Sequence, residues 1–122
     1  MHILLSNTSK EPLFQQIKEQ IKQQIYQEEL KEGEALPSIR LLAKQLQVSV
    51  ITTKRAYEDL EKEGFLVSSV GKGTFVAGQQ PHILKERQIQ ELENDLEQIV
   101  EKAQQIGLTK QAFIERIDLF FD

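Results

Sequence analysis

The 122-residue sequence contains no cysteine and no tryptophan, and it has only two histidines. Without cysteine there can be no disulfide, zinc–thiolate site or thiol nucleophile. Neither His2 nor His82 lies at metal-ligand spacing from a second histidine, so no metal and no cofactor are expected. The carboxylates cluster on expected helix faces, where solvated surface is their common role. We find no catalytic constellation and expect a protein that is not an enzyme.

Long hydrophobic runs are missing as well. No stretch approaches the ~18 apolar residues of a membrane span. The N-terminal "MHILLSNTSK" lacks the basic region and the small-residue cleavage site of a signal peptide. We therefore expect a cytoplasmic protein that makes no membrane contact. Its hydrophobic content of 39% is ordinary for a folded globular chain.

Negative charge is absent from the middle of an otherwise acidic chain. The first 80 residues balance ten Lys/Arg against ten Asp/Glu, whereas the remainder holds five against nine. Within residues 35–57 every charge is positive, contributed by Arg40, Lys44, Lys54 and Arg55. Such a patch suggests a polyanionic partner, and a merely solvated helix face fits the charges equally well.

Apolar spacing predicts a mostly α-helical fold with a small β-hairpin. One helix begins near Pro12, Ser38 can cap a second of about nine residues, and Ser49 can cap a third that reaches about residue 63. Two short helices with so brief a connection are typical of a helix-turn-helix. The segment "FLVSSVGKGTFVAG" then predicts a hairpin, which forms a wing. The expected core of this part is Phe14, Ile17, Leu42, Leu46, Ala56, Leu60 and Phe75.

The last third of the chain predicts a helical hairpin. A long helix begins near Pro81 with a heptad seam, Gly107 ends it, and Thr109 can cap another helix. An apolar seam needs a cover, so we expect residues 1–78 to form a winged helix-turn-helix domain and residues 79–122 a dimerisation hairpin. The expected dimer interface is Ile89, Leu92, Leu96, Ile99, Ala103, Ile106, Phe113, Ile117 and Phe120.

The helix-turn-helix pattern indicates double-stranded DNA as the partner. A helix fits the major groove, and helix N-termini and basic side chains hold phosphates. Arg40 opposes the dipole of the second helix, which a nearby phosphate or guanine would explain. Glycines around Lys72 allow the wing tip to approach a DNA backbone closely. They do not form a nucleotide-binding loop, because Lys72 is followed by Gly73 rather than Ser or Thr.

The stretch "GEALPSIRLLAKQLQVSVITTKRAYEDLEKEGFLVSSVGKGTFV" resembles the GntR family of bacterial transcription regulators. That family's N-terminal winged helix-turn-helix carries LPS-x-R-x-LA, then VS, then AY-x-x-L-x-x-EG, then GKGTFV, and the match spans about residues 12 to 77. The resemblance implies operator contacts at the LPS-x-R motif, at the start of the recognition helix and at the wing. The expected DNA-contacting residues are Ser38, Arg40, Ser49, Val50, Ile51, Thr52, Thr53, Lys54, Gly71, Lys72 and Gly73.

The chain departs from the family pattern after VS. Many members have Arg-Asn there, whereas this chain has Val50 and Ile51, which either meet thymine methyl groups or pack on the second helix. The stretch "VSVITTKRAYEDLE" and the short tail instead resemble the YtrA-like subgroup, whose helical tails dimerise and whose members often repress operons for ABC transporters. We expect a dimeric repressor on an inverted-repeat operator, with its small-molecule effector unknown. A winged helix that binds a protein partner is the alternative.

Overall fold

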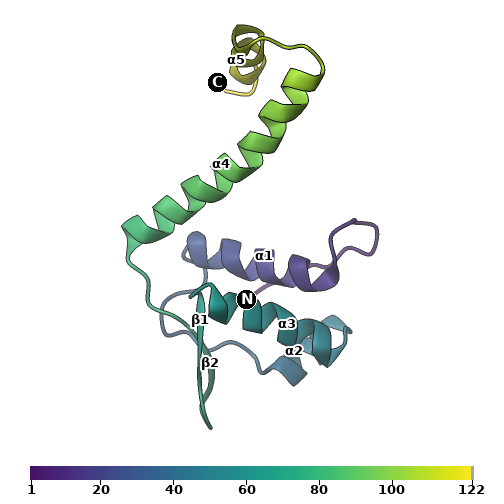
Figure 1. Ribbon diagram of the computed structural model, residues 1–122. Coiled ribbons are helices and arrows are strands. Elements are labelled where there is room, and N and C mark those ends of the chain that lie inside the picture. The colour runs from purple at the N-terminus through teal and green to yellow at the C-terminus, as the bar shows by residue number, and fades with distance from the viewer. Residues whose placement is uncertain (122) are drawn as a thin grey trace. The chain divides into compact units, whose positions relative to one another are not determined.

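The computed structural model describes residues 1–121 (Figure 1). The predicted fold class, mostly α-helical with a small β-hairpin, is confirmed. Contacts divide the chain into two compact units, residues 1–80 and the residues from 81 onward. The elements in chain order are α1 (Leu13–Tyr26), α2 (Ile39–Leu46), α3 (Val50–Lys62), β1 (Leu66–Ser69), β2 (Gly73–Val76), α4 (Pro81–Gln105) and α5 (Lys110–Asp118).

The core of the first unit surrounds α3, which packs against both α1 and α2 (Figure 1). Of the expected core residues, Ile17, Leu42, Ala56 and Leu60 are buried. The remaining three, Phe14, Leu46 and Phe75, are half-buried. Because α1 and α2 cover two sides of α3, the side of α3 that carries Ile51 stays open to solvent.

Three helices begin at the caps that the sequence predicts. The hydroxyl oxygens of Ser38, Ser49 and Thr109 each accept a hydrogen bond from the backbone N–H three residues later, at 3.0–3.1 Å. Such a cap contributes about 1 kcal/mol to helix stability. Helix α1 ends at Tyr26, before the apolar Leu30. Leu30 is nevertheless buried, because the chain turns back and its N–H donates to the carbonyl of Gln24 at 3.0 Å.

The wing is an antiparallel hairpin in which Leu66 lies opposite Val76. A third segment, residues 33–36, pairs with β2 and was not predicted from the sequence. Leu36 donates its N–H to the carbonyl of Thr74, and Val76 donates to that of Glu34, both at 2.9 Å. Since α2 follows this segment almost at once, the pairing fixes the base of the wing relative to the helix-turn-helix.

The N-terminal segment is held against α1 by a ladder of glutamine side chains, which was also not predicted. Each amide accepts from the backbone N–H and donates to the backbone C=O of the same residue, at 2.6–3.2 Å. Helix residues four apart share a face at a rise of about 6 Å, close to the ~6.7 Å between alternate residues of an extended chain. The pairs are Gln24 with His2, Gln20 with Leu4, and Gln16 with Ser6.

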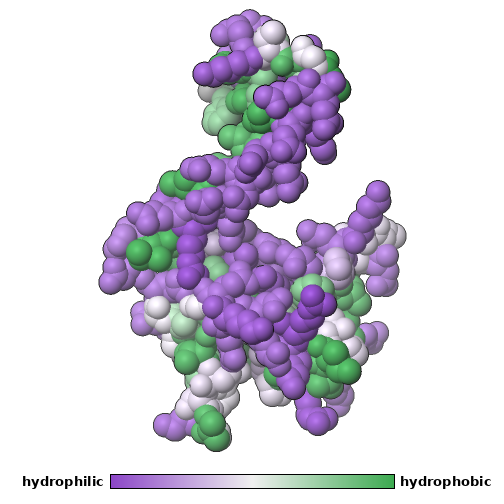
Figure 2. Space-filling view, in the orientation of Figure 1, coloured by the Kyte–Doolittle hydropathy of each residue, from purple (hydrophilic) through white to green (hydrophobic). Residues whose placement is uncertain are grey.

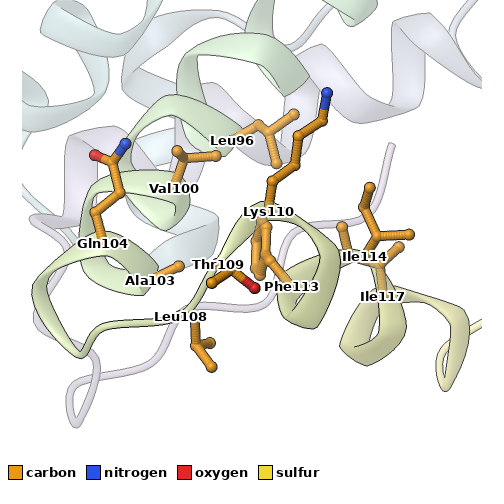
Figure 3. A pocket seen from close by; sticks show the side chains of 10 residues that line it. All are labelled: Leu96, Val100, Ala103, Gln104, Leu108, Thr109, Lys110, Phe113, Ile114 and Ile117. Atoms are coloured by element: carbon orange, nitrogen blue, oxygen red, sulfur yellow. The ribbon is translucent and has the colours of Figure 1, made fainter.

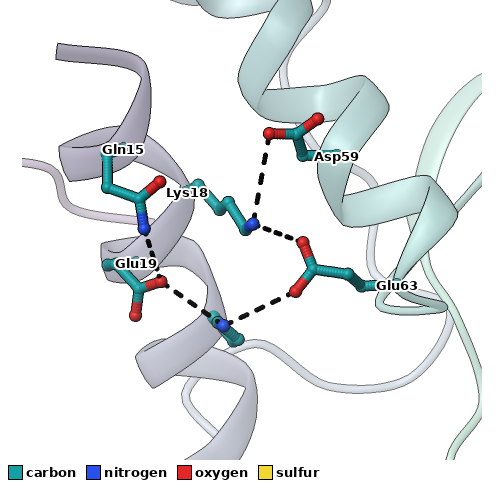
Figure 4. A network of polar contacts seen from close by, with 6 residues as sticks. Gln15, Lys18, Glu19, Asp59 and Glu63 are labelled. Atoms are coloured by element: carbon teal, nitrogen blue, oxygen red, sulfur yellow. Dashed lines mark hydrogen bonds and ion pairs between the residues drawn. The ribbon is translucent and has the colours of Figure 1, made fainter. Parts of the chain in front are cut away.

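Ion pairs join α1 to the C-terminal half of α3 (Figure 4). Lys18 lies 4.0 Å from Asp59 and also pairs with Glu63. Lys22 lies 3.6 Å from Glu63 and 3.4 Å from Glu19. Lys22 is buried, and a buried cation costs free energy unless it is paired. These contacts therefore fix how α1 and α3 pack.

The second unit is a helical hairpin in which Gly107, with a φ of 81°, follows α4. Among its described residues only Ala103 is buried. Figure 2 shows hydrophobic residues at the surface of α4 and α5. A mainly apolar pocket of about 460 Å³ opens between these two helices (Figure 3). Its lining is Leu96, Val100, Ala103, Gln104, Leu108, Thr109, Lys110, Phe113, Ile114 and Ile117.

Candidate nucleic-acid interface

The first turn of α2 presents Ser38 and Arg40 to solvent. Helix α3 fixes the position of this turn, because the hydroxyl of Tyr57 on α3 donates a hydrogen bond to the carbonyl of Pro37 at 2.7 Å. Burial raises the pKa of Tyr57, so this hydroxyl keeps its proton and stays a donor over the neutral range. The start of α2 is thus tethered to the helix that carries the other candidate residues.

The first turn of α3 combines a cap with exposed backbone donors. The Ser49 hydroxyl accepts from the Thr52 N–H and donates to the Thr52 side-chain oxygen at 2.8 Å. The first N–H groups of a helix have no intrahelical partner, and they favour a bound anion. With Ser49 exposed, this turn can hold a phosphate.

Thr53 does not belong to this exposed surface. Its side chain is 0% exposed, and its hydroxyl donates to the carbonyl of Ser49 at 3.3 Å. The expected DNA contact of Thr53 is therefore wrong, because a fully buried side chain cannot touch DNA. Helical periodicity could have predicted this burial, because Thr53 lies three residues before Ala56 and seven before Leu60, and both of these are buried.

The sequence left open whether Val50 and Ile51 meet thymine methyl groups or pack on the second helix, and their exposure bears on this choice. Ile51 is 81% exposed, so packing on α2 is wrong for this residue, and Val50 is also exposed. Exposed isoleucine at the start of such a helix is suited to contact with a thymine methyl group. One turn further along the same face lie Lys54 and Arg55.

Two cations on α3 have different partners. Lys54 lies 3.7 Å from Glu58 in the next turn, and both side chains are well exposed. Arg55 instead lies with its guanidinium carbon 3.6 Å from the centroid of the Phe14 ring on α1. Arg55 belongs to the positive patch from which the sequence suggests a polyanionic partner, but its contact with Phe14 was not predicted, because that ring comes from another helix.

The wing tip carries Gly71, Lys72 and Gly73, all of which are exposed. The N–H of Lys72 donates to the carbonyl of Ser69 at 3.0 Å and closes a four-residue turn. Gly71, at the third position of this turn, has a φ of 77°, which side chains disfavour. No atom lies within 4 Å of where a side chain would begin at Gly71, so the requirement for glycine is one of backbone conformation.

The structure divides the expected dimer residues into two groups. Ala103 is buried, and Phe113 and Ile117 are half-buried and line the pocket within the hairpin. The others are exposed, namely Ile89, Leu92, Leu96, Ile99, Ile106 and Phe120.

Metal and membrane features can be assessed for residues 1–121. In this range no three His, Asp or Glu side chains are placed to hold a metal ion. No helix of the same range is both long enough and apolar enough to cross a membrane.

The three-helix unit with its hairpin defines the protein as a winged helix-turn-helix protein. The family model described as "Bacterial regulatory proteins, gntR family" matches residues 13–76. The chain belongs to the gntR family. Its relatives are transcription regulators, so the chain is a regulator of the DNA-binding gntR type and not an enzyme.

Two relatives from Bacillus subtilis (strain 168) match along most of their length. The uncharacterized HTH-type transcriptional regulator YhcF is 34% identical over 112 residues, which cover 92% of each chain. The HTH-type transcriptional repressor YtrA is 29% identical over 115 residues, covering 94% of this chain and 88% of YtrA. The match to YtrA supports the YtrA-like subgroup.

Two solved structures extend the comparison. The crystal structure of a transcriptional antiterminator from Listeria monocytogenes EGD-e has a TM-score of 0.77 at 26% identity, covering 100% of this chain and 91% of that one. The crystal structure of AraR(DBD) in complex with operator ORX1 has a TM-score of 0.56 at 32% identity, covering 63% of this chain and 96% of that one. The second likeness concerns a domain with DNA bound.

Proposed function

We propose that the protein is a homodimeric repressor that binds an inverted-repeat operator in double-stranded DNA. In each subunit α3 lies in the major groove, the first turns of α2 and α3 hold phosphates, and the wing tip lies against the neighbouring backbone. Residues 1–78 bind the DNA, and residues 79–122 hold two subunits together. The relatives named as repressors and the AraR(DBD) complex with its operator support this proposal.

The observation that carries the proposal is the exposed surface formed by the starts of α2 and α3. It presents Arg40 and Lys54 beside the starts of two helices, whose first N–H groups have no intrahelical partner, while hydrogen bonds and packing fix the elements beneath. The Tyr57 hydrogen bond to Pro37 is one of these contacts. Interfaces that read DNA need such fixed donors, because phosphate contacts set the register in which bases are read.

Base reading is assigned to Arg40 and to the apolar pair at the start of α3. If Arg40 bonds a guanine, Arg40→Ala should cost about 1 to 3 kcal/mol and relax specificity at one position in each half-site. Val50 and Ile51 call for thymine at the positions they face. Replacing that thymine with uracil removes only the methyl group and should weaken binding.

The dimer rests on the exposed apolar residues of α4. Five of them follow the heptad seam and are left open within the subunit: Ile89, Leu92, Leu96, Ile99 and Ile106. A second subunit would remove this stripe from water. Two-fold symmetry then requires an inverted repeat, with half-sites spaced to match the two recognition helices. The YtrA-like resemblance makes genes for an ABC transporter the first regulatory target to examine.

Selection of bound sequences from random duplex DNA tests the proposal. Enrichment of an inverted repeat, with affinity that falls steeply as salt rises, is the expected result. Arg40→Ala should weaken binding to the selected sequence, whereas the matched control Lys31→Ala, which removes an exposed cation outside this surface, should not. No enrichment of any sequence would overturn the proposal and favour the protein-partner alternative.

A further inference from the structure

Arg55 makes a close cation contact with an aromatic ring of another helix. Its guanidinium carbon lies 3.6 Å from the centroid of Phe14, so the guanidinium rests against the face of the ring. By comparison, the Lys22 ammonium lies 5.7 Å from the Phe65 centroid. Contact at this distance joins the recognition helix to the first turn of α1.

This contact leaves the hydrogen-bonding capacity of Arg55 unused. A guanidinium has five N–H donors around its edge, and an aromatic ring occupies only its face. Within residues 1–121 no carboxylate lies within ion-pair distance of Arg55, whereas Lys18, Lys22 and Lys54 each pair with at least one. Arg55 is exposed, so its donors face solvent.

The position of Arg55 matches the edge of the proposed interface. It lies one turn after Ile51 on the open face of α3, on the side toward α1. A side chain that flanks the base-reading turn in this way meets the sugar-phosphate backbone rather than the base edges. Holding the guanidinium against Phe14 before DNA arrives removes part of the ordering cost of binding.

We propose that Arg55 is a phosphate contact of the DNA interface and that Phe14 holds its guanidinium in the binding orientation. This inference rests on the proposed DNA-binding function and adds to it a residue from the α1 side of the interface. Arg55 binds the phosphate, and Phe14 acts as a positioning residue.

Titration of the selected duplex at several salt concentrations provides the test. Arg55→Ala should weaken binding roughly 5- to 10-fold on all sequences alike, and should lower the slope of log affinity against log salt by about one. Arg55→Lys keeps the charge but not the planar face, so the slope should persist while affinity falls about 2- to 3-fold. Phe14→Leu should also weaken binding about 2- to 3-fold with the slope unchanged, and should have no effect once Arg55 is alanine.

A purely structural role for the contact predicts a different pattern. Arg55→Ala would then shift the urea midpoint and leave both the affinity of the folded protein and the salt slope as in wild type, which would overturn the inference. Additive effects of Phe14→Leu and Arg55→Ala on affinity would overturn the positioning role. Arg40→Ala separates this failure from that of the proposed function: if it weakens binding while the Arg55 variants do not, DNA binding stands and only the Arg55 assignment fails.

Discussion

The two units of the chain treat their apolar side chains in opposite ways. In the first unit Ile17, Ile21 and Leu60 are fully enclosed, and the wing contributes Leu66 and Val76 to the same core. In the second unit Ala103 is the single buried residue among those described, while the other five residues of the heptad seam are exposed. The first unit therefore has a hydrophobic core of its own, whereas the second exposes apolar surface that association would cover.

Polar side chains show the same contrast. In the first unit glutamines Gln16, Gln20 and Gln24 bind a segment 10 to 22 residues away in sequence, and ion pairs join α1 to α3. In the second unit the hydrogen bond from Gln90 to Asn94 spans a single helical turn. Long-range polar contacts give the first unit a fixed shape, which the proposed reading of an operator sequence requires.

Separation of the two units gives the largest expected effect. A chain truncated after Gln80 should stay folded, because the core of the first unit lies upstream of that residue. It should be monomeric and should bind the full operator about 10²- to 10⁴-fold more weakly, since two linked half-sites no longer act together. Sedimentation beside titration on full and half operators measures both. A truncated protein that still sediments as a dimer would contradict the assignment of the tail.

One isoleucine from each unit, Ile21 and Ile106, tests this contrast by single substitutions. Ile21 is 0% exposed, so Ile21→Ala should lower the free energy of unfolding of the first unit by about 2–5 kcal/mol. Ile106 is 76% exposed, so Ile106→Ala should change subunit stability by less than about 0.5 kcal/mol but weaken dimerisation. Urea unfolding of residues 1–80 tests the first substitution, and sedimentation equilibrium of the full chain tests the second. A stable Ile21→Ala variant would be inconsistent with a self-sufficient core.

Tyr57→Phe should have a smaller effect, confined to the first unit. It leaves the Pro37 carbonyl without its partner and should cost about 1–3 kcal/mol of unfolding free energy. Because burial raises the pKa of Tyr57, the folded state holds this proton more tightly than the unfolded chain. The stability that the protonated Tyr57 contributes is fully present below about pH 10, the pKa of a tyrosine in the unfolded chain. It is lost as the pH rises above that value. Urea midpoints at pH 8 and 11 should therefore differ more in wild type than in Tyr57→Phe, and an equal difference would count against the burial of this hydroxyl.

Local features of the fold were predictable from the sequence. The caps at Ser38, Ser49 and Thr109 follow from hydroxyl chemistry within three residues, and a change to strand-forming residues around a glycine turn predicts the wing. The exposed residues at the starts of α2 and α3 follow from the same local rules. Their DNA contacts stay a prediction.

Features that join distant segments were not predictable. Glutamines on a helix carry no apolar period, so Gln20 gives no sign that it binds the backbone of Leu4. The pairing of residues 33–36 with β2 depends on where the tertiary fold places them, and the contact between Arg55 and Phe14 joins two helices. Thr53 is different, because helical periodicity alone would have placed it in the core.

The smallest expected effect concerns Glu58, an acidic residue on the otherwise basic open face of α3. It lies 3.7 Å from Lys54, one turn away, and in the proposed complex it would compete with DNA phosphates for that ammonium. Glu58→Gln removes the charge at similar size and should raise operator affinity about 2- to 3-fold at low salt, with the gain fading as salt screens the pair.

Glu115→Gln, an equal charge change at an exposed position of α5, serves as the control and should leave affinity unchanged. Titrations of both variants on one duplex at two salt concentrations measure the difference. Equal gains would mean that net charge alone attracts the DNA, and a loss in Glu58→Gln would mean that the carboxylate orders Lys54 for binding.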